Sequence, residues 1–312
     1  MIKTIVSTEM PVDEHFYIRK NVYQHGESHK RLCIVTGTHG DELEGQMVCY
    51  EVGRHIKDHP EWLDGEVDIY PALNPLGIDT IQRGIPNFDL DMNRIFPGDP
   101  NGTMFEQTAA AIMKDISGAD MVIDVHSSNL YLRETPQVRI NVLHEDRLVP
   151  WAQLLNVDFI WVHDAATVLE STLAYSLNST GTPCLVVEMG VGQRINHKMC
   201  NKLVDGIFNM MRHMQMWSQD MSQIFLTDPI VCKGNRVTFL NAEASGVFLT
   251  ELKCGVVVAK GETIGQIVSP LDSEVLSNVV APGEGYLFTI RAYPIVYEGS
   301  LVARIYNFEE QQ

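Results

Sequence analysis

From residue 31 onward, short runs of β-branched and other apolar residues alternate with longer segments in which apolar residues recur every three or four positions. Strands followed by amphipathic helices assemble into layered α/β domains with a parallel or mixed sheet, so this alternation constrains the fold strongly. The predicted strands cover residues 31–38, 66–74, 121–126, 137–143 and 184–190. The predicted helices cover residues 42–59 and 196 to about 216, together with a segment whose buried face carries Phe105, Ala109, Ile112 and Ile116. We therefore predict an α/β fold in which a mixed β-sheet is flanked by helices.

The residue pattern changes after about residue 225, where short predicted strands separated by glycines replace the helical patterns. An internal repeat lies in this part, because residues 246–267 match residues 285–305. Two similar halves suggest a quasi-symmetric β-sandwich. We therefore predict a large α/β domain over residues 1–225 and an all-β module over residues 226–312.

Each half of the repeat resembles the biotinyl/lipoyl carrier fold, in which a strand, a glycine turn and another strand form one half. The central turn reads Lys253-Cys254-Gly255, without the Met-Lys-Met of biotin carriers or the Asp-Lys-Ala of lipoyl carriers. The resemblance therefore implies a structural β-sandwich without a carrier function. Such a module could shape the rim of a site or form a subunit contact.

The net charge of the chain is −17, from 40 acidic and 23 basic side chains, and the sequence contains no basic stripe. Such a chain would repel a polyanion, so we expect no nucleic-acid partner. A neutral or cationic substrate fits this balance, although most of the charge is expected to serve solubility. The N-terminal segment lacks the apolar core of a signal peptide, and no apolar run approaches the roughly 18 residues that span a bilayer. We expect a cytoplasmic protein without membrane association. Assembly into a homo-oligomer is possible on this sequence.

The most informative stretch of the sequence is Thr-Gly-Thr-His-Gly-Asp-Glu, in which His39 follows a predicted strand and Glu42 lies three residues further on. Both side chains can therefore converge on one point above the end of that strand. Two histidines and one glutamate are an established ligand set for catalytic zinc, which keeps one coordination position open. The second histidine should come from a distant part of the sequence. His126, at the end of another predicted strand, is the best candidate, and His144 and His163 are weaker alternatives.

Further polar residues follow in a fixed order: an Asn-Arg pair in DLDMNRIFPG, the histidine of DVHSS and the glutamate of VVEMG. Together with GTHGDE they resemble the succinylglutamate desuccinylase/aspartoacylase family of the zinc carboxypeptidase-like superfamily, over roughly residues 31–215. DMNR stands where the family more often has DLNR, which exchanges similar apolar volumes. The resemblance implies a carboxypeptidase-like sheet and a role for each matching residue. One zinc ion per chain would be held by His39, Glu42 and His126, and Glu188 would act as the general base and acid. Asn93 and Arg94 would bind a carboxylate of the substrate, and Arg83 would polarise the scissile carbonyl.

Elementary chemistry supports parts of this assignment. A carboxylate at Glu188, directly after a buried apolar run, is costly to place there without a function. The planar guanidinium of Arg94 suits the recognition of a carboxylate. For Arg83, an exposed loop arginine is the alternative. Asp124 lies two residues before His126 and could orient that histidine or make a structural hydrogen bond.

The resemblance implies a zinc-dependent amidohydrolase that removes an acyl group, of the acetyl or succinyl type, from a small N-acyl amino acid. Within the family, chains with a repeated β tail look most similar to deacetylases of N-acetylated diamino acids. Two alternatives stay open: a zinc carboxypeptidase that acts on short peptides, and a non-catalytic binding protein of the same fold. The presence of all three metal ligands and of Glu188 disfavours the second alternative.

Overall fold

The structure of the protein is a computed structural model, and it describes residues 1–164, 170–220 and 224–308. Before residue 225, the described strands are β1 (Ile2–Glu9), β2 (His15–His25), β3 (Arg31–Thr36), β4 (Gly65–Tyr70), β5 (Met121–Ser127), β6 (Leu132–Asn141), β7 (Phe159–His163) and β8 (Cys184–Gly190). The helices described are α1 (Glu44–Asp58), α2 (Pro75–Thr80), α3 (Met104–Ile116), α4 (Glu145–Ala152), α5 (Leu173–Ser179) and α6 (His197–His213). Short 3₁₀ turns lie at Pro11–Asp13, Pro60–Trp62, Met92–Arg94 and Val142–His144. The later strands are β9 (Ile230–Cys232), β10 (Val237–Asn241), β11 (Gly246–Leu249), β12 (Val256–Val258), β13 (Thr263–Ser269), β14 (Glu274–Val280), β15 (Gly285–Arg291), β16 (Ile295–Val296) and β17 (Leu301–Asn307).

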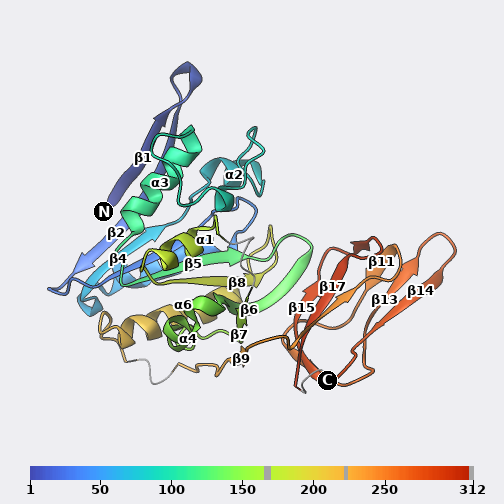
Figure 1. Ribbon diagram of the computed structural model, residues 1–312. Coiled ribbons are helices and arrows are strands. Elements are labelled where there is room, and N and C mark those ends of the chain that lie inside the picture. The colour runs from blue at the N-terminus through green and yellow to red at the C-terminus, as the bar shows by residue number, and fades with distance from the viewer. Residues whose placement is uncertain (165–169, 221–223, 309–312) are drawn as a thin grey trace.

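A 13-stranded mixed sheet organises the molecule, and its main path runs β1-β2-β4-β3-β5-β8-β6-β15-β17-β10. Within it, β3 is parallel to both of its neighbours, β4 and β5, and β8 lies parallel to β5 on the other side. The carboxyl ends of β3, β5 and β8 therefore meet at one edge, where α/β proteins commonly bind ligands. Figure 1 shows the helices gathered around this part of the sheet, with the later strands projecting to one side. The predicted α/β fold with a mixed sheet is confirmed.

The central strands are apolar on both faces because helices cover both faces. Ile34 of β3 belongs to a buried cluster with Val52 of α1 and Ile207 of α6, whereas the next residue, Val35, packs on the opposite side with Ile112 of α3. This alternation follows from the two-residue period of a strand. The predicted buried face of α3 is confirmed, since all of its members are at most 3% exposed: Phe105, Ala109, Ile112 and Ile116.

Two predicted boundaries at the first strand–helix junction are wrong by about two residues. The strand predicted over residues 31–38 ends at Thr36, because the left-handed backbone of Gly37, with φ of 67°, turns the chain. The following helix begins at Glu44, so Glu42 lies in the turn before the helix and outside its first turn. No element was predicted before residue 31, where β1 and β2 form an antiparallel hairpin that extends the sheet beyond β4.

The internal repeat is visible in the arrangement of the later strands. The first copy of the repeat contains the strands β11, β12 and β13. The corresponding strands of the second copy are, in the same order, β15, β16 and β17. The first and last strands of each copy pair antiparallel. The short middle strand of each copy pairs with the first strand of the other copy, β12 with β15 and β16 with β11. The C-terminal part is thus antiparallel β structure with quasi-symmetric halves, and its likeness to a biotinyl/lipoyl module stays a prediction.

Strands from the two sides of residue 225 share the large sheet. β15 pairs with β6 in antiparallel fashion, with Thr289 opposite Glu134, and β9 pairs in parallel with β7. The domain boundary near residue 225 stays a prediction. We call residues 226–308 the β module and use that name below.

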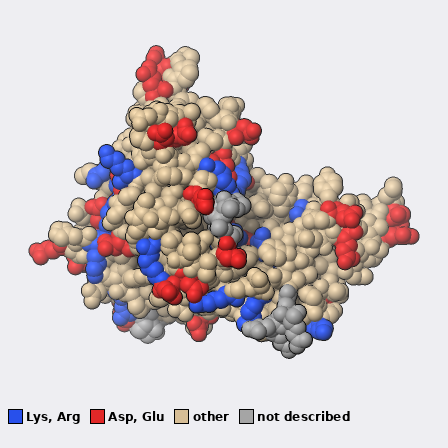
Figure 2. Space-filling view, viewed as in Figure 1, with Lys and Arg blue, Asp and Glu red and all other residues tan. Residues whose placement is uncertain are grey.

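The surface carries mixed charges. On the face drawn in Figure 2, acidic and basic side chains are interspersed, and both signs occur around the central part of the molecule. Among the described residues, no helix is both long enough and apolar enough to cross a membrane.

Candidate metal centre and active site

Two of the three predicted metal ligands lie in the turn that joins β3 to α1. The turn packs closely against α2, because a Cβ atom at Gly40 would lie 1.9 Å from the backbone carbon of Gly77. A glycine is therefore required at this position. The tight path carries His39 and Glu42 over the carboxyl ends of the parallel strands.

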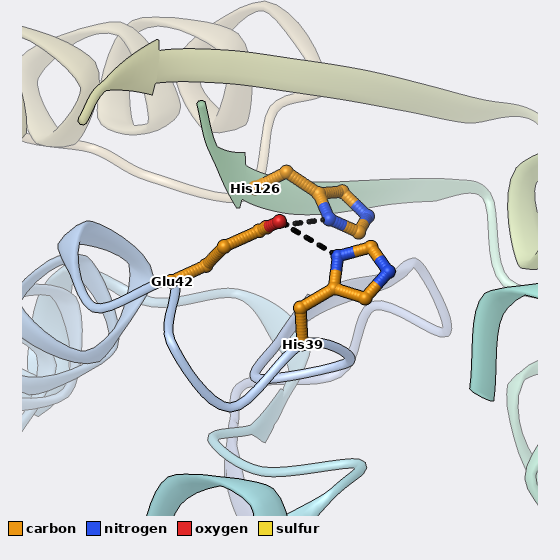
Figure 3. A group of neighbouring side chains, drawn as sticks. All are labelled: His39, Glu42 and His126. Carbon is orange, nitrogen blue, oxygen red and sulfur yellow. Dashed lines mark hydrogen bonds and ion pairs between the residues drawn. The ribbon is translucent and has the colours of Figure 1, made fainter. Parts of the chain in front are cut away.

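His126 of β5 completes the group, and Figure 3 shows its ring directed toward the Glu42 carboxylate beside the ring of His39. His39 Nδ1 lies 2.7 Å from Glu42 Oε1, and His126 Nδ1 lies 2.9 Å from Glu42 Oε2. One ligand atom from each residue lies within 4.8 Å of the others. Burial would raise the pKa of Glu42, but the two imidazoles hold it below its usual range. The structure thus brings the three predicted ligands into one buried group.

The outer nitrogen of each imidazole faces a second carboxylate. His39 Nε2 forms a 3.0 Å hydrogen bond with Asp91 Oδ1, and His126 Nε2 lies 3.1 Å from Asp124 Oδ2. Histidines that bind metals typically present their second nitrogen to a carboxylate, which fixes the ring with its other nitrogen toward the metal. Asp124 thus lies where it can orient His126. Asp91 was not predicted, although it stands in the same DLDMNR motif as the Asn-Arg pair.

The donor set fits a divalent cation. His39 Nδ1 is buried and makes no hydrogen bond among the described residues, although Glu42 Oε1 lies only 2.7 Å away. A bound cation would give the buried His39 Nδ1 a partner. Two imidazoles and one carboxylate match the His₂Glu set of catalytic zinc sites.

Glu188 lies on β8, directly beside His126 in the register of the two parallel strands. Its side chain is 16% exposed, and its Oε1 accepts a hydrogen bond from Arg139 Nη1 at 3.3 Å. Burial raises the pKa of Glu188, and the Arg139 guanidinium opposes that rise. A carboxyl group with a raised pKa is better suited to exchange a proton near neutral pH.

The three remaining predicted residues approach from the segment between α2 and α3. Arg83 Nη1 donates to Glu42 Oε1 at 2.9 Å, so this arginine reaches the metal group even though its side chain is 43% exposed. Asn93 Oδ1 accepts the backbone N–H of Leu173 at 3.0 Å, which ties the turn to the start of α5. Arg94 is exposed, and its Nη1 donates to the main-chain oxygen of Asn93 at 2.7 Å.

A cavity of about 450 Å³ lies over this edge of the sheet. All the predicted site residues line it: His39, Glu42, Arg83, Asn93, Arg94, His126 and Glu188. Sequence reasoning missed three other charged residues of its wall, Glu134 and Arg139 on β6 and Arg304 on β17. His163, one of the alternative ligands, also lines the cavity but lies outside the group formed around Glu42.

Comparison with known proteins gives a family for this chain. The sequence profile of the succinylglutamate desuccinylase/aspartoacylase catalytic domain matches residues 28–214, more than half of the chain. The chain belongs to this family. An N-alpha-acetyl-L-2,4-diaminobutyric acid deacetylase from Halomonas elongata is 24% identical over 259 residues, which cover 79% of this chain and 72% of that relative.

Solved structures extend the likeness in fold to nearly the whole chain. A succinylglutamate desuccinylase/aspartoacylase from Rhodobacter sphaeroides is 23% identical with a TM-score of 0.81, over 97% of this chain and 95% of its own. The product-bound ectoine utilization protein EutE (DoeB) from Ruegeria pomeroyi is 21% identical with a TM-score of 0.80, over 97% and 93%. At these identities the comparisons show a shared fold, and the coverage includes the β module.

Proposed function

We propose that the protein is a zinc-dependent amidohydrolase that removes an acyl group, of the acetyl or succinyl type, from a small N-acyl amino acid. The convergence of His39, Glu42 and His126 in a cavity that Glu188 also lines carries this proposal. A cavity of about 450 Å³ is of the size that takes a small molecule. Family membership supports the reaction class, and the deacetylase from Halomonas elongata supports an acetyl group on a diamino acid.

In the proposed reaction, water adds to the acyl carbon, the amide C–N bond breaks, and a carboxylate and a free amine are released. Zinc held by His39, Glu42 and His126 would supply Lewis acidity and activate water at neutral pH. Glu188 takes a proton from the attacking water and delivers it to the leaving nitrogen. Its position next to His126 in the strand register supports both of these roles.

Substrate binding is proposed for the segment between α2 and α3. Arg94 lines the cavity, and its guanidinium suits a bidentate contact with a substrate carboxylate. Asn93 can contribute its side-chain N–H groups, because its Oδ1 already accepts the N–H of Leu173. Arg83, next to Glu42, can donate to the acyl oxygen as negative charge develops there.

The variant Glu188→Gln tests the mechanism. We expect it to abolish amide hydrolysis and to retain about one zinc per chain by elemental analysis, because its side chain lies outside the ligand set. Glu274→Gln, an exposed strand glutamate of the β module, is the matched control and should keep full activity. Full activity of Glu188→Gln would refute the mechanism.

A substrate panel tests the reaction class. N-acetyl and N-succinyl amino acids, including diamino acids, are compared with C-terminal dipeptides, and the release of free amine is measured. Hydrolysis of the acylated amino acids is expected. A preference for dipeptides would favour a carboxypeptidase, and tight binding without turnover of any of them would favour a binding protein.

A further inference from the structure

We propose that Arg304 of the β module is a positioning residue for Glu188 and that it acts through Glu134 and Arg139. The inference rests on the proposed role of Glu188 as general base. It gives the β module a part in catalysis, because the residue that starts the chain of contacts lies on β17.

The contacts form an unbroken line of alternating charge across the wall of the cavity. Arg304 Nη1 donates to Glu134 Oε1 at 2.6 Å, and Thr289 Oγ1 donates to the same oxygen at 3.1 Å. Arg139 Nη2 contacts both oxygens of Glu134, at 2.9 and 2.8 Å. Its other terminal nitrogen, Nη1, reaches Glu188 Oε1 at 3.3 Å. Two guanidinium groups and two carboxylates thus balance one another.

The strand register explains why these side chains meet. Arg304 lies opposite Thr289, and Thr289 lies opposite Glu134, so the three form one row across β17, β15 and β6. Glu134 and Arg139 are five residues apart and would face opposite sides of a regular strand. The pairing of β6 with β8 shifts register between Glu134 and Gln137, and this irregularity turns both charged side chains toward the cavity.

The geometry indicates that Glu134 fixes Arg139 and leaves Glu188 free to exchange a proton. Glu134 is 1% exposed, so its charge depends on its donors. The two contacts from Arg139 Nη2 to Glu134 are 0.4 Å or more shorter than the 3.3 Å contact from Nη1 to Glu188. Because the stronger pairing is with Glu134, the guanidinium is held beside Glu188 without forming a tight ion pair with it.

Removal of Arg304 takes the closest donor away from Glu134. The carboxylate then shifts toward Arg139, and Arg139 no longer keeps one position beside Glu188. The metal group and Arg94 belong to other elements, so substrate binding should change little. The expected signature is a loss of kcat with a nearly constant KM.

The test compares Arg304→Met with Arg304→Lys, which can still reach Glu134 with one charge. Loss of an outer contact that orients a reacting group typically costs at least about tenfold, so we expect kcat of Arg304→Met to fall by about that factor with KM within about twofold. Arg304→Lys should recover most of the loss, and both variants should keep the zinc content of the parent. Arg236→Met is the matched control: this arginine of the β module stacks on Tyr306 at 5.1 Å and should leave kcat unchanged.

Each other outcome decides against the inference. Unchanged kcat in Arg304→Met refutes it, and a raised KM with constant kcat would mean that Arg304 binds substrate directly. A loss that lysine does not recover would indicate a merely structural role. If Arg304→Met fails to fold by circular dichroism, Thr289→Val removes one hydroxyl donor from Glu134 and must still lower kcat measurably.

The same experiments separate this inference from the proposed function. Activity in Glu188→Gln would refute the proposed function itself, whatever Arg304 does. An inactive Glu188→Gln beside a fully active Arg304→Met would refute the positioning role alone.

Discussion

Replacement of Asp124 by asparagine tests how strongly a carboxylate beside the outer nitrogen of a ligand histidine affects the metal affinity of the site. Asp124 is 1% exposed, and neither of its oxygens makes a hydrogen bond among the described residues. Its Oδ2 lies 3.1 Å from His126 Nε2, so its charge acts mainly on that imidazole. Asparagine keeps the shape and removes the charge. Loss of such a carboxylate typically weakens metal binding about 10- to 100-fold, which equals about 1.4–2.7 kcal/mol.

The metal-free protein should lose stability as well. Burial lowers the pKa of His126, but the Asp124 and Glu42 carboxylates outweigh it and hold that pKa well above its usual value, so Asp124 and His126 form a buried charge pair when no metal is bound. Asp124→Asn should therefore lower the Tm of the metal-free protein and also reduce the further rise in Tm that added zinc produces. Competition with a fluorescent zinc chelator measures the affinity, and calorimetry of both forms measures Tm.

The control for this prediction is Asp120→Asn, just before the same strand. The exposed carboxylate of Asp120 accepts the N–H of Arg31 at 2.7 Å and does not contact an imidazole of the metal group. Its zinc affinity should equal that of the parent. If Asp124→Asn also binds zinc as tightly as the parent, Asp124 does not tune the site and the reasoning is wrong.

Three further predictions concern the turn, the carboxylate contact and a buried lysine. Gly40→Ala should lower the free energy of unfolding by about 1–3 kcal/mol in urea titrations and weaken zinc binding, because its Cβ would lie 1.9 Å from a backbone carbon of α2. Arg94→Lys should raise KM about tenfold with little change in kcat, since lysine cannot make a bidentate contact. Burial lowers the pKa of Lys20, but Asp115 and Asp68 outweigh it and hold the pKa above 10.5. The stability that Lys20 provides is therefore complete below pH 10.5 and is lost as the pH rises through the folded pKa. Because Arg31 still contacts Asp68 in Lys20→Met, the variant should be destabilised by about 1.5–3 kcal/mol at pH 8, and the difference should shrink as the pH rises above 10.5.

The sequence predicts the central part of the fold well because burial on both faces leaves a strong signal. β3, β5 and β8 appear as short, mainly apolar runs, and α3 shows a clean helical period. The hairpin of β1 and β2 leaves a weaker sequence signal, because charged residues such as Lys20 occupy part of its buried face and pair there with Asp68. The short α2 and α5 are positioned by tertiary contacts, such as the one between Asn93 and Leu173, that no local pattern records.

The residues of the candidate site also divide into those that the sequence predicts and those that it does not. His39, Glu42, His126 and Glu188 sit at or just after the ends of parallel strands, so topology alone brings them to one edge of the sheet. Asp91 could have been recognised from its place in the DLDMNR motif. Its contact with His39 depends on how the loop folds back over the turn, which the spacing of residues does not reveal.

Arg304 marks the limit of what spacing can predict, for a physical reason. It is 170 residues from Glu134 in sequence, and the two meet only because β15 pairs with β6 on one side and with β17 on the other. On β6 the irregularity before Gln137 reverses the side that Glu134 faces, so a regular two-residue period would place Glu134 and Arg139 on opposite faces. A regular strand would place Glu134 on the apolar face of Val138 and Ile140, whereas here the carboxylate faces the cavity and is paired with three donors. A buried carboxylate is costly unless its donors are held in place, so the join between β6 and the β module should resist separation, and an isolated 1–225 fragment should lose activity even where its metal ligands are intact.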